Sequence, residues 1–299
     1  MISIIICTYN RDKFLADCLK SLTNQTLDTS KFEVIIINNK CTDMSDVIIR
    51  DYMNKYSSIN WKYFFEDKQG LSYARNRGIA EAKGNVIAFL DDDAIACANY
   101  AEYLLEQFQL SDFDAGGGKI IPKWEVEKPK WMNRFLLPLV SVIDLGNKQK
   151  QFKRRKYPIG ANMFLKRNTI ETIGIFNPSL GRIGKSLLGG EEKDIFNRIK
   201  NSGQIIGYFP EIWVYHIIPK ERTEVGFIKS QALGIGASER IRTIESNVSI
   251  IRPLIIEFLK WIATIILSIY YLLLLRSSSS IMLIRFRWWV SKGLLHKHI

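Results

Sequence analysis

The sequence predicts an α/β fold built on a Rossmann-like, mixed but mainly parallel sheet, and two observations carry this prediction. Over residues 1–90, short β-branched runs alternate with amphipathic segments of helix length, which is typical of parallel strands joined by crossover helices. Polar residues follow each run, as expected where the carboxyl ends of strands line a ligand crevice. The 299 residues, 47% of them hydrophobic, suffice for one large domain or two small ones.

The expected elements follow this alternation in order. Strands are expected at 2–7, 33–37, 61–65 and 86–90, with helices at 12–22, 43–55 and 71–82. Farther on, a helix is expected at 100–108, strands at 119–122, 204–209 and 212–216 and through residue 165, and a helix at 192–201. No Pro-, Ser- or Gly-rich linker separates the two halves, so the second half is expected to extend the same sheet.

The C-terminal part changes character. Residues 253–275 are nearly all apolar, and a basic, aromatic tail with Arg285, Arg287, Trp288 and Trp289 follows. A membrane-spanning helix needs about 20 apolar residues. Glu257 and Lys260 interrupt this run, and a charge at a helix centre costs about 2.5–3.5 kcal/mol on insertion. We therefore expect a helix that lies in or dips into the membrane, with its tail on anionic headgroups; a buried core helix is the alternative.

The net charge of +12 calls for an acidic partner, such as anionic lipid or a phosphate-bearing substrate. No zinc-finger spacing, RNP-like motif or basic-region heptad is present, so nucleic acid is not expected as a partner. The four cysteines form no CxxC pair and are expected to be buried or incidental thiols in a reducing compartment. Met1 runs directly into a strand-like segment, so no secretion signal is expected.

Two acidic motifs are the candidates for chemistry. Asp91, Asp92 and Asp93 follow an apolar strand, where three adjacent carboxylates repel one another unless a cation such as Mg²⁺ compensates. A solvated acidic turn is the alternative. Glu191 and Glu192 follow paired glycines and precede an amphipathic helix; one of them could take a proton from an attacking hydroxyl, although first-turn acids also simply suit the helix dipole.

Around these motifs the chain resembles family 2 glycosyltransferases of the A-type fold, from Met1 to about residue 238. The opening strand and its turn match the family segment that holds the nucleotide base, through Thr8, Tyr9, Asn10 and Arg11. The second-strand loop of the family corresponds to residues 38–43. Its first two residues are Asn38 and Asn39. Asn38 replaces the family's usual base-contacting Asp, and its amide oxygen can still accept a hydrogen bond.

The resemblance also implies roles for the charged residues. Arg75, in a segment similar to the family's Gly-x-x-x-Ala-Arg-Asn-x-Gly helix, is implied to face the donor. Asp93 is the implied direct ligand of Mg²⁺ or Mn²⁺, with Asp91 nearer the ribose and also near the metal. Asp92 is also placed with the nucleotide sugar, and its role is the least defined of the three. Glu192 is the implied base, one methylene longer than the common Asp, and Glu191 is the second choice.

His216 resembles the later histidine that binds metal or diphosphate in some relatives; a structural histidine is the alternative. The acceptor is expected to contact a tryptophan, a turn and the paired glycines, through Trp124, Gly160, Ala161, Asn162 and Gly190. A core tryptophan is the competing interpretation of Trp124.

Two apparent motifs are set aside. Residues 181–186 echo a phosphate loop, but Ser179 stands where glycine is required. Arg287 and Trp288 echo the Gln-x-x-Arg-Trp motif of processive synthases, but Ile284 stands in the place of Gln. The sequence therefore favours transfer of single sugars over polymerisation.

The sequence thus predicts an inverting glycosyltransferase that moves a sugar from a UDP-linked donor to a lipid-linked or surface-polysaccharide acceptor. Residues 1–240 are expected to form the catalytic domain, with a nucleotide-sugar half at 1–110 and an acceptor half at 111–240. Residues 241–299 would attach it, as a peripheral or monotopic protein, to the cytoplasmic face of the cell membrane. The alternatives are a membrane-anchored, non-catalytic nucleotide- or sugar-binding module and a nucleotidyltransferase.

Overall fold

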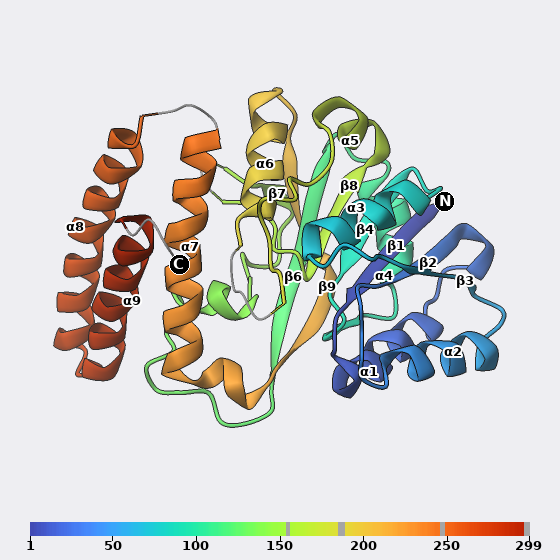
Figure 1. Ribbon diagram of the computed structural model, residues 1–299, viewed down its shortest axis with the longest axis horizontal. Helices are drawn as coiled ribbons and strands as arrows, with labels where there is room; N and C mark the ends of the chain where they lie inside the picture. The colour runs from blue at the N-terminus through green and yellow to red at the C-terminus, as the bar shows by residue number, and fades with distance from the viewer. Residues whose placement is uncertain (154–155, 185–188, 246–248, 296–299) are drawn as a thin grey trace. The chain divides into compact units, whose positions relative to one another are not determined.

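The computed structural model describes residues 1–153, 156–184, 189–245 and 249–295 (Figure 1). Lys185 and Ser186 of the phosphate-loop echo lie outside these ranges. The chain forms two compact units. The first comprises Met1–Lys123, Ser141–Ser179 and Glu191–Ile217, and the second comprises Trp124–Val140, Leu180–Gly190 and Ile218–Ile299.

One mixed sheet organises the first unit. Its strands lie in the order β3-β2-β1-β4-β8-β6-β9-β5, and β7 pairs with β9. The parallel part consists of β1 (Ile2–Thr8), β2 (Phe32–Asn38), β3 (Asn60–Phe65) and β4 (Val86–Leu90). The later strands are β5 (Ala94–Ala96), β6 (Ala115–Trp124), β7 (Lys150–Gln151), β8 (Asn162–Lys166) and β9 (Ile206–Ile218). The pairs β4–β8, β6–β8, β5–β9 and β7–β9 are antiparallel. The predicted mixed sheet, extended by the second half of the chain, is confirmed.

Helices cover both faces of this sheet and produce two separate cores. On one face lie α1 (Asp12–Thr23), α2 (Ser45–Lys55), α4 (Tyr100–Tyr103) and the π-helix η2 (Leu104–Phe108). On the other lie α3 (Leu71–Glu81), α5 (Arg167–Ile173) and α6 (Glu191–Asn201). Because side chains alternate along a strand, Ile4 packs in the first core and Ile5 in the second. A 3₁₀ turn, η1 (Thr29–Lys31), leads into β2.

One predicted pair of strands is wrong. The sequence indicated separate strands at 204–209 and 212–216, whereas β9 is continuous from Ile206 to Ile218. Pro210 explains why continuity is possible. On one side of β9, β7 pairs at Gly207 and Tyr208 while β5 pairs only from Val214 onward. Pro210 lies between these partners, where its missing N–H costs no hydrogen bond to either.

The second unit is mainly helical. Its long helices are α7 (Val225–Glu245), α8 (Ile251–Leu273) and α9 (Ser277–Leu295), and η3 (Leu137–Val140) and η4 (Lys220–Thr223) are short 3₁₀ turns. Helix α9 contacts both α7 and α8 and lies between them (Figure 1). A Cβ at Gly236 of α7 would collide with the Val290 carbonyl, and one at Gly293 of α9 with the Leu233 carbonyl. The absence of both side chains therefore lets these backbones meet.

Two expectations for this region change. The segment beyond residue 276 was expected to be a tail on headgroups, but residues 277–295 form α9 and pack on two helices. Glu257, expected to interrupt the apolar run, is buried and ion-paired with Arg287 of α9 at 3.2 Å. Within the described residues, α8 is the one helix that is long and apolar enough, by length and composition alone, to cross a membrane, with mean hydropathy 1.7. The domain boundary at residue 240 falls inside α7 and stays a prediction.

A buried carboxylate fixes the amino-terminal ends of the first strands. Glu33 of β2 is fully buried, accepts a hydrogen bond from Ser3 of β1 at 2.6 Å and pairs with Lys62 of β3 at 2.6 Å. The amide of Lys83 donates to the same carboxylate at 2.6 Å. Burial opposes ionisation, but the hydrogen bonds from Lys62, Ser3 and Lys83 outweigh it and lower the pKa of Glu33.

We predict that Glu33→Ala lowers the free energy of unfolding by about 3 kcal/mol, because Lys62 and the other groups that contact this buried carboxylate lose their partner. Since the folded pKa of Glu33 is lowered, this contribution is complete above the unfolded pKa of about 4.3 and disappears as the pH falls through the folded pKa. Urea unfolding at several pH values measures both effects. The exposed Glu106→Ala is the matched control, expected within about 0.5 kcal/mol of the parent. An equal loss in both variants would contradict this account.

Candidate active site

The carboxyl edge of the parallel strands brings the predicted donor-side residues together. Thr8 ends β1 and is paired in register with Asn38 at the end of β2. The next strand on the other side of β1 is β4, and Asp91 follows it directly. Parallel strands end at the same edge of a sheet, so three loops far apart in sequence converge there.

The metal-competent cluster depends on a second pairing in the sheet. Strand β5 begins just after Asp93 and pairs antiparallel with β9, with Ala94 opposite His216. The Ile217 amide donates to the Asp93 carbonyl at 2.9 Å, and His216 Nε2 lies 3.0 Å from Asp93 Oδ1. Ligand atoms of Asp91, Asp93 and His216 all lie within 4.8 Å of one another. Two carboxylates and an imidazole form a donor set that suits Mg²⁺ or, with its nitrogen, Mn²⁺, so these residues fit the implied ion.

Arg11, the residue before α1, is the protein's own counter-charge at this cluster. Its guanidinium donates to Asp93, and its Nε lies 3.7 Å from Asp92 Oδ1. Burial raises the pKa of Asp92 to about 7; Arg11 acts against this shift, whereas Asp93 and Asp91 add to it. Arg11 contacts two of the three aspartates, and Arg75 near Asp91 is shared with two glutamates, so the acids outnumber the arginines and a divalent cation would relieve the excess negative charge.

Arg75 joins the two acidic motifs. It lies on α3 with only 2% of its side chain exposed, and its guanidinium is 3.0 Å from Glu191, 3.3 Å from Glu192 and 3.9 Å from Asp91. Burial disfavours the charged guanidinium, but Glu192, Glu191 and Asp91 together raise the pKa of Arg75. Its central carbon also lies 5.3 Å from the centre of the Phe176 ring. Arg75 is thus a fixed cation that holds α3, α6 and the end of β4 around one point.

The two glutamates at the start of α6 differ in accessibility. The Glu191 side chain is 5% exposed and the Glu192 side chain 22%. The amide of Gly160, just before β8, donates to Glu192 Oε1 at 2.9 Å. A Cβ at position 160 would collide with this carboxylate oxygen and with the Arg75 guanidinium. A side chain at position 160 would therefore force Glu192 or Arg75 to move.

Several predicted nucleotide contacts are themselves part of a loop network. Asn38 donates to the Tyr63 hydroxyl at 2.7 Å and accepts from the Cys41 amide at 2.8 Å. Asn39 accepts from the Gly70 amide and donates to the carbonyls of residues 66 and 68. Asn10, at φ +52°, accepts from the amide of residue 42 at 2.7 Å. These contacts fix the loop shapes, while the proposed contacts of these side chains and of half-buried Tyr9 with a nucleotide stay predictions.

The residues expected to contact the acceptor lie in different environments. Ala161 is fully buried in a core. Asn162 is also buried; its amide donates to the Ile212 carbonyl at 2.7 Å and accepts from the Tyr100 hydroxyl at 3.2 Å. Trp124 and Gly190 belong to the second unit. The Gly160 amide donates to Glu192, and the acceptor roles of all five stay predictions.

Sequence reasoning missed the support behind Asn38. The Tyr63 hydroxyl, which receives the Asn38 amide, donates to Asp46 of α2 at 2.7 Å. Burial, together with the hydrogen bond to Asp46, raises the pKa of Tyr63. The sequence could have indicated Tyr63, because it lies in the strand that pairs with the strand ending at Asn38. Its partner Asp46 on α2 could not be predicted from a local sequence pattern.

With this geometry established, the chain can be compared with known proteins. The sequence model described as glycosyl transferase family 2 matches residues 3–174. The chain is a glycosyltransferase of family 2. A glucosyl-dolichyl phosphate glucuronosyltransferase from Haloferax volcanii is 24% identical over 254 residues, covering 80% of this chain and 76% of that protein.

Solved structures agree on the fold. A mannosyltransferase from Pyrobaculum calidifontis, in complex with GDP-Man and Mn²⁺, has a TM-score of 0.63 and 15% identity, covering 99% of this chain and 88% of that one. TarS from S. aureus, as a fragment in complex with UDP-GlcNAc, has a TM-score of 0.56 and 17% identity, covering 78% and 66%. The A-type fold expected from the sequence is confirmed, and this chain spans only part of each of these proteins.

We predict that Gly160→Ala lowers the free energy of unfolding by about 1–3 kcal/mol, because the added methyl group must displace Glu192 or Arg75 in a packed site. Gly189→Ala is the matched control, since a Cβ there meets nothing within 4 Å. Chemical denaturation of both variants measures the difference. If Gly160→Ala were as stable as the parent, the site would accommodate the methyl group without cost, which would contradict the predicted collision with Glu192 and Arg75.

Proposed function

We propose that the protein transfers a sugar, with inversion, from a UDP-linked donor to a hydroxyl of a lipid-linked or surface-polysaccharide acceptor. The observation that carries the proposal is the buried Arg75, which joins Asp91 of the metal-competent set to a more accessible glutamate, Glu192. Such an arrangement combines a place for a diphosphate with a group that can accept a proton, and transfer to a hydroxyl needs both.

The donor would lie at the carboxyl edge of β1, β2 and β4. Asp91, Asp93 and His216 supply the ligand set that would hold Mg²⁺ or Mn²⁺. A bound divalent ion supplies positive charge that neutralises a leaving diphosphate. Two A-type structures support a nucleotide-sugar donor, because they were solved with UDP-GlcNAc and with GDP-Man and Mn²⁺. At the base, Asn38 stands where the family usually has Asp, and we keep uridine as the proposed base because an amide oxygen can still accept a hydrogen bond from it.

Glu192 would act as the general base. A base must reach the proton of the acceptor hydroxyl, and the Glu192 carboxylate is more exposed than that of Glu191, at 22% against 5%. Glu191 pairs with Arg75 at 3.0 Å and would position that arginine. The Gly160 amide, which donates to Glu192, would hold the carboxylate in its orientation toward the acceptor side.

A membrane setting is supported by two observations. The relative from Haloferax volcanii carries dolichyl phosphate in its name, and helix α8 is long and apolar enough to cross a membrane by length and composition. We infer that the acceptor is reached at the cytoplasmic face of the membrane, where a nucleotide-sugar donor is available, and that the protein is peripheral or monotopic there.

We predict that Glu192→Gln lowers kcat by about 10²–10⁴-fold, the usual contribution of a general base, while donor affinity changes little. Glu191→Gln should mainly weaken folding, because it removes the closest partner of buried Arg75. Transfer assays and donor titration of both variants separate these effects. Full activity of Glu192→Gln would overturn its role as base.

We predict that Asp93→Asn and His216→Ala each weaken Mn²⁺ binding at least tenfold, since each removes a ligand rather than an outer-shell partner. Asp92→Asn is the matched control, because Asp92 stands outside the metal-competent set. Calorimetric titration with Mn²⁺, and with UDP- and GDP-sugars in its presence and absence, provides the measurement. Nucleotide-sugar binding that is indifferent to Mn²⁺ would count against the metal role.

A further inference from the structure

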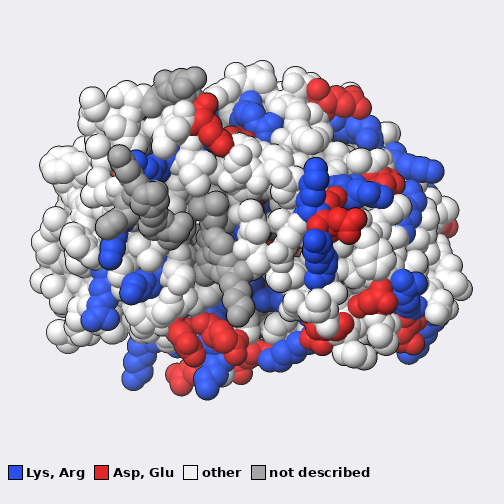
Figure 2. Space-filling view, in the orientation of Figure 1, with Lys and Arg blue, Asp and Glu red and all other residues white. Residues whose placement is uncertain are grey.

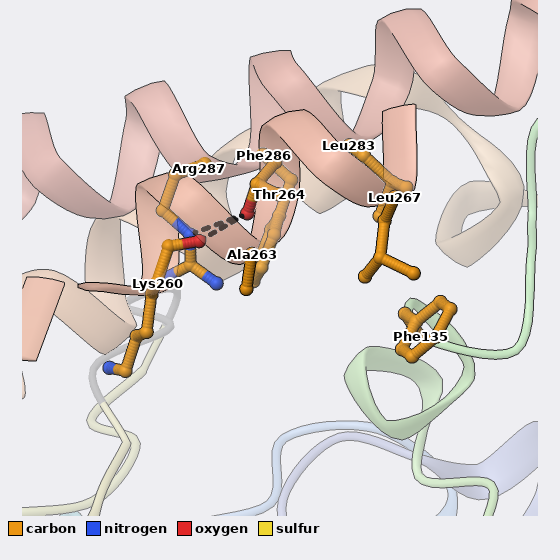
Figure 3. Close-up of a pocket in the computed structure, with 8 residues that line it drawn as sticks. All are labelled: Phe135, Lys260, Ala263, Thr264, Leu267, Leu283, Phe286 and Arg287. Carbon is orange, nitrogen blue, oxygen red and sulfur yellow. Dashed lines mark hydrogen bonds between the residues drawn. The ribbon is translucent and has the colours of Figure 1, made fainter. Parts of the chain in front are cut away.

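A pocket of about 210 Å³ lies in the second unit, between α8, α9 and the segment before η3 (Figure 3). Ala263 and Leu267 come from α8, Leu283 and Phe286 from α9, and Phe135 faces Leu267 from the third segment. These side chains form apolar walls. None of the residues assigned to sugar transfer lines this pocket.

The end of the pocket away from Phe135 and Leu267 carries positive charge. Arg287 contacts both carboxylate oxygens of Glu257 at 3.2 Å and the Thr264 hydroxyl at 3.4 Å. Lys260 Nζ lies 3.5 Å from the same carboxylate, which also accepts from Ser291 at 3.0 Å. Two cations therefore share one carboxylate, and an ammonium and a guanidinium carry eight N–H donors between them. The pocket thus has surplus positive charge at one end and apolar walls at the other (Figure 3).

An exposed apolar face adjoins the pocket. Ile262 and Ile266 are 44% and 62% exposed, and each precedes a wall residue, Ala263 or Leu267, by one position on α8. The same face continues through other exposed side chains, namely Ile255, Phe258, Leu259, Ile265, Ile269 and Leu273. Figure 2 shows mostly neutral side chains at the left edge, where α8 lies. An apolar patch of this kind on one helix is typical of a surface that contacts a membrane.

We propose that this pocket binds an anionic membrane phospholipid, with the phosphate at Lys260 and Arg287 and the start of an acyl chain along the apolar walls. An inorganic phosphate or a nucleotide would leave the apolar half unfilled, and a neutral lipid would not use the surplus cation. A bilayer in contact with the exposed face of α8 would present phospholipid directly beside the pocket. The proposal does not depend on sugar transfer, because it concerns a separate site.

The test uses the full chain and vesicles of phosphatidylcholine with or without phosphatidylglycerol, followed by co-sedimentation. We expect binding to require phosphatidylglycerol and Lys260→Ala to weaken it about fivefold, the usual effect of one cation at an anionic surface. Lys260 is 40% exposed at its side chain, so its loss is tolerable for folding. Arg285→Ala, an equal charge change at an exposed position of α9, should have a smaller effect.

An uncharged pair of variants separates the pocket from general attraction. Leu267→Trp fills the pocket and should weaken binding about as much as Lys260→Ala, whereas Ile266→Trp adds the same ring to the outer face and should not. Parent-like binding by Leu267→Trp, or equal losses with Lys260→Ala and Arg285→Ala, would overturn the proposal. It would also be overturned if a polyprenyl phosphate added to the vesicles, rather than phosphatidylglycerol, carried the dependence on Lys260.

Discussion

The buried guanidinium of Arg75 is the interaction on which the arrangement of the site depends. Glu191, Glu192 and Asp91 all lie within 4 Å of it, and without a central cation three carboxylates at this distance would repel one another. A buried charge that loses its partner costs several kcal/mol, so the ends of α3, β4 and α6 are coupled through this one side chain. The chemistry proposed for Glu192 therefore rests on a residue that need not touch the acceptor.

The sequence predicted most of the framework and part of the site. Strand β4 is found at the expected residues and β1 within one residue of them, because short β-branched runs bounded by polar loops leave little choice. The convergence of Thr8, Asn38 and Asp91 followed from parallel pairing alone. The contacts of Arg11 with Asp93 and of Gly160 with Glu192 span 82 and 32 residues. They depend on how elements pack, which no local pattern records.

The C-terminal region shows the same limit more strongly. Its serines and arginines gave no helix signal strong enough to predict α9, and Glu257 counted as a charge in an apolar run. In the structure Glu257 faces Arg287, and Gly236 and Gly293 allow α7 and α9 to approach. Charge that is costly in one helix becomes acceptable when a second helix neutralises it. The length of the apolar run therefore did not predict how α8 packs, because the residue that neutralises Glu257 lies on α9.

The pairing of β5 with β9 has a consequence for how this enzyme can change over evolutionary time. Side chains alternate along a strand, so a slip of one residue moves each to the opposite face. Such a slip would place Tyr215 or Ile217 where His216 now stands beside Asp93. Length changes inside these strands would therefore destroy the cluster, whereas insertions in the connecting loops leave it intact. The loops can therefore change in length and sequence while Asp93 and His216 stay paired. In this way the same fold could come to bind different acceptors with its acidic residues in place.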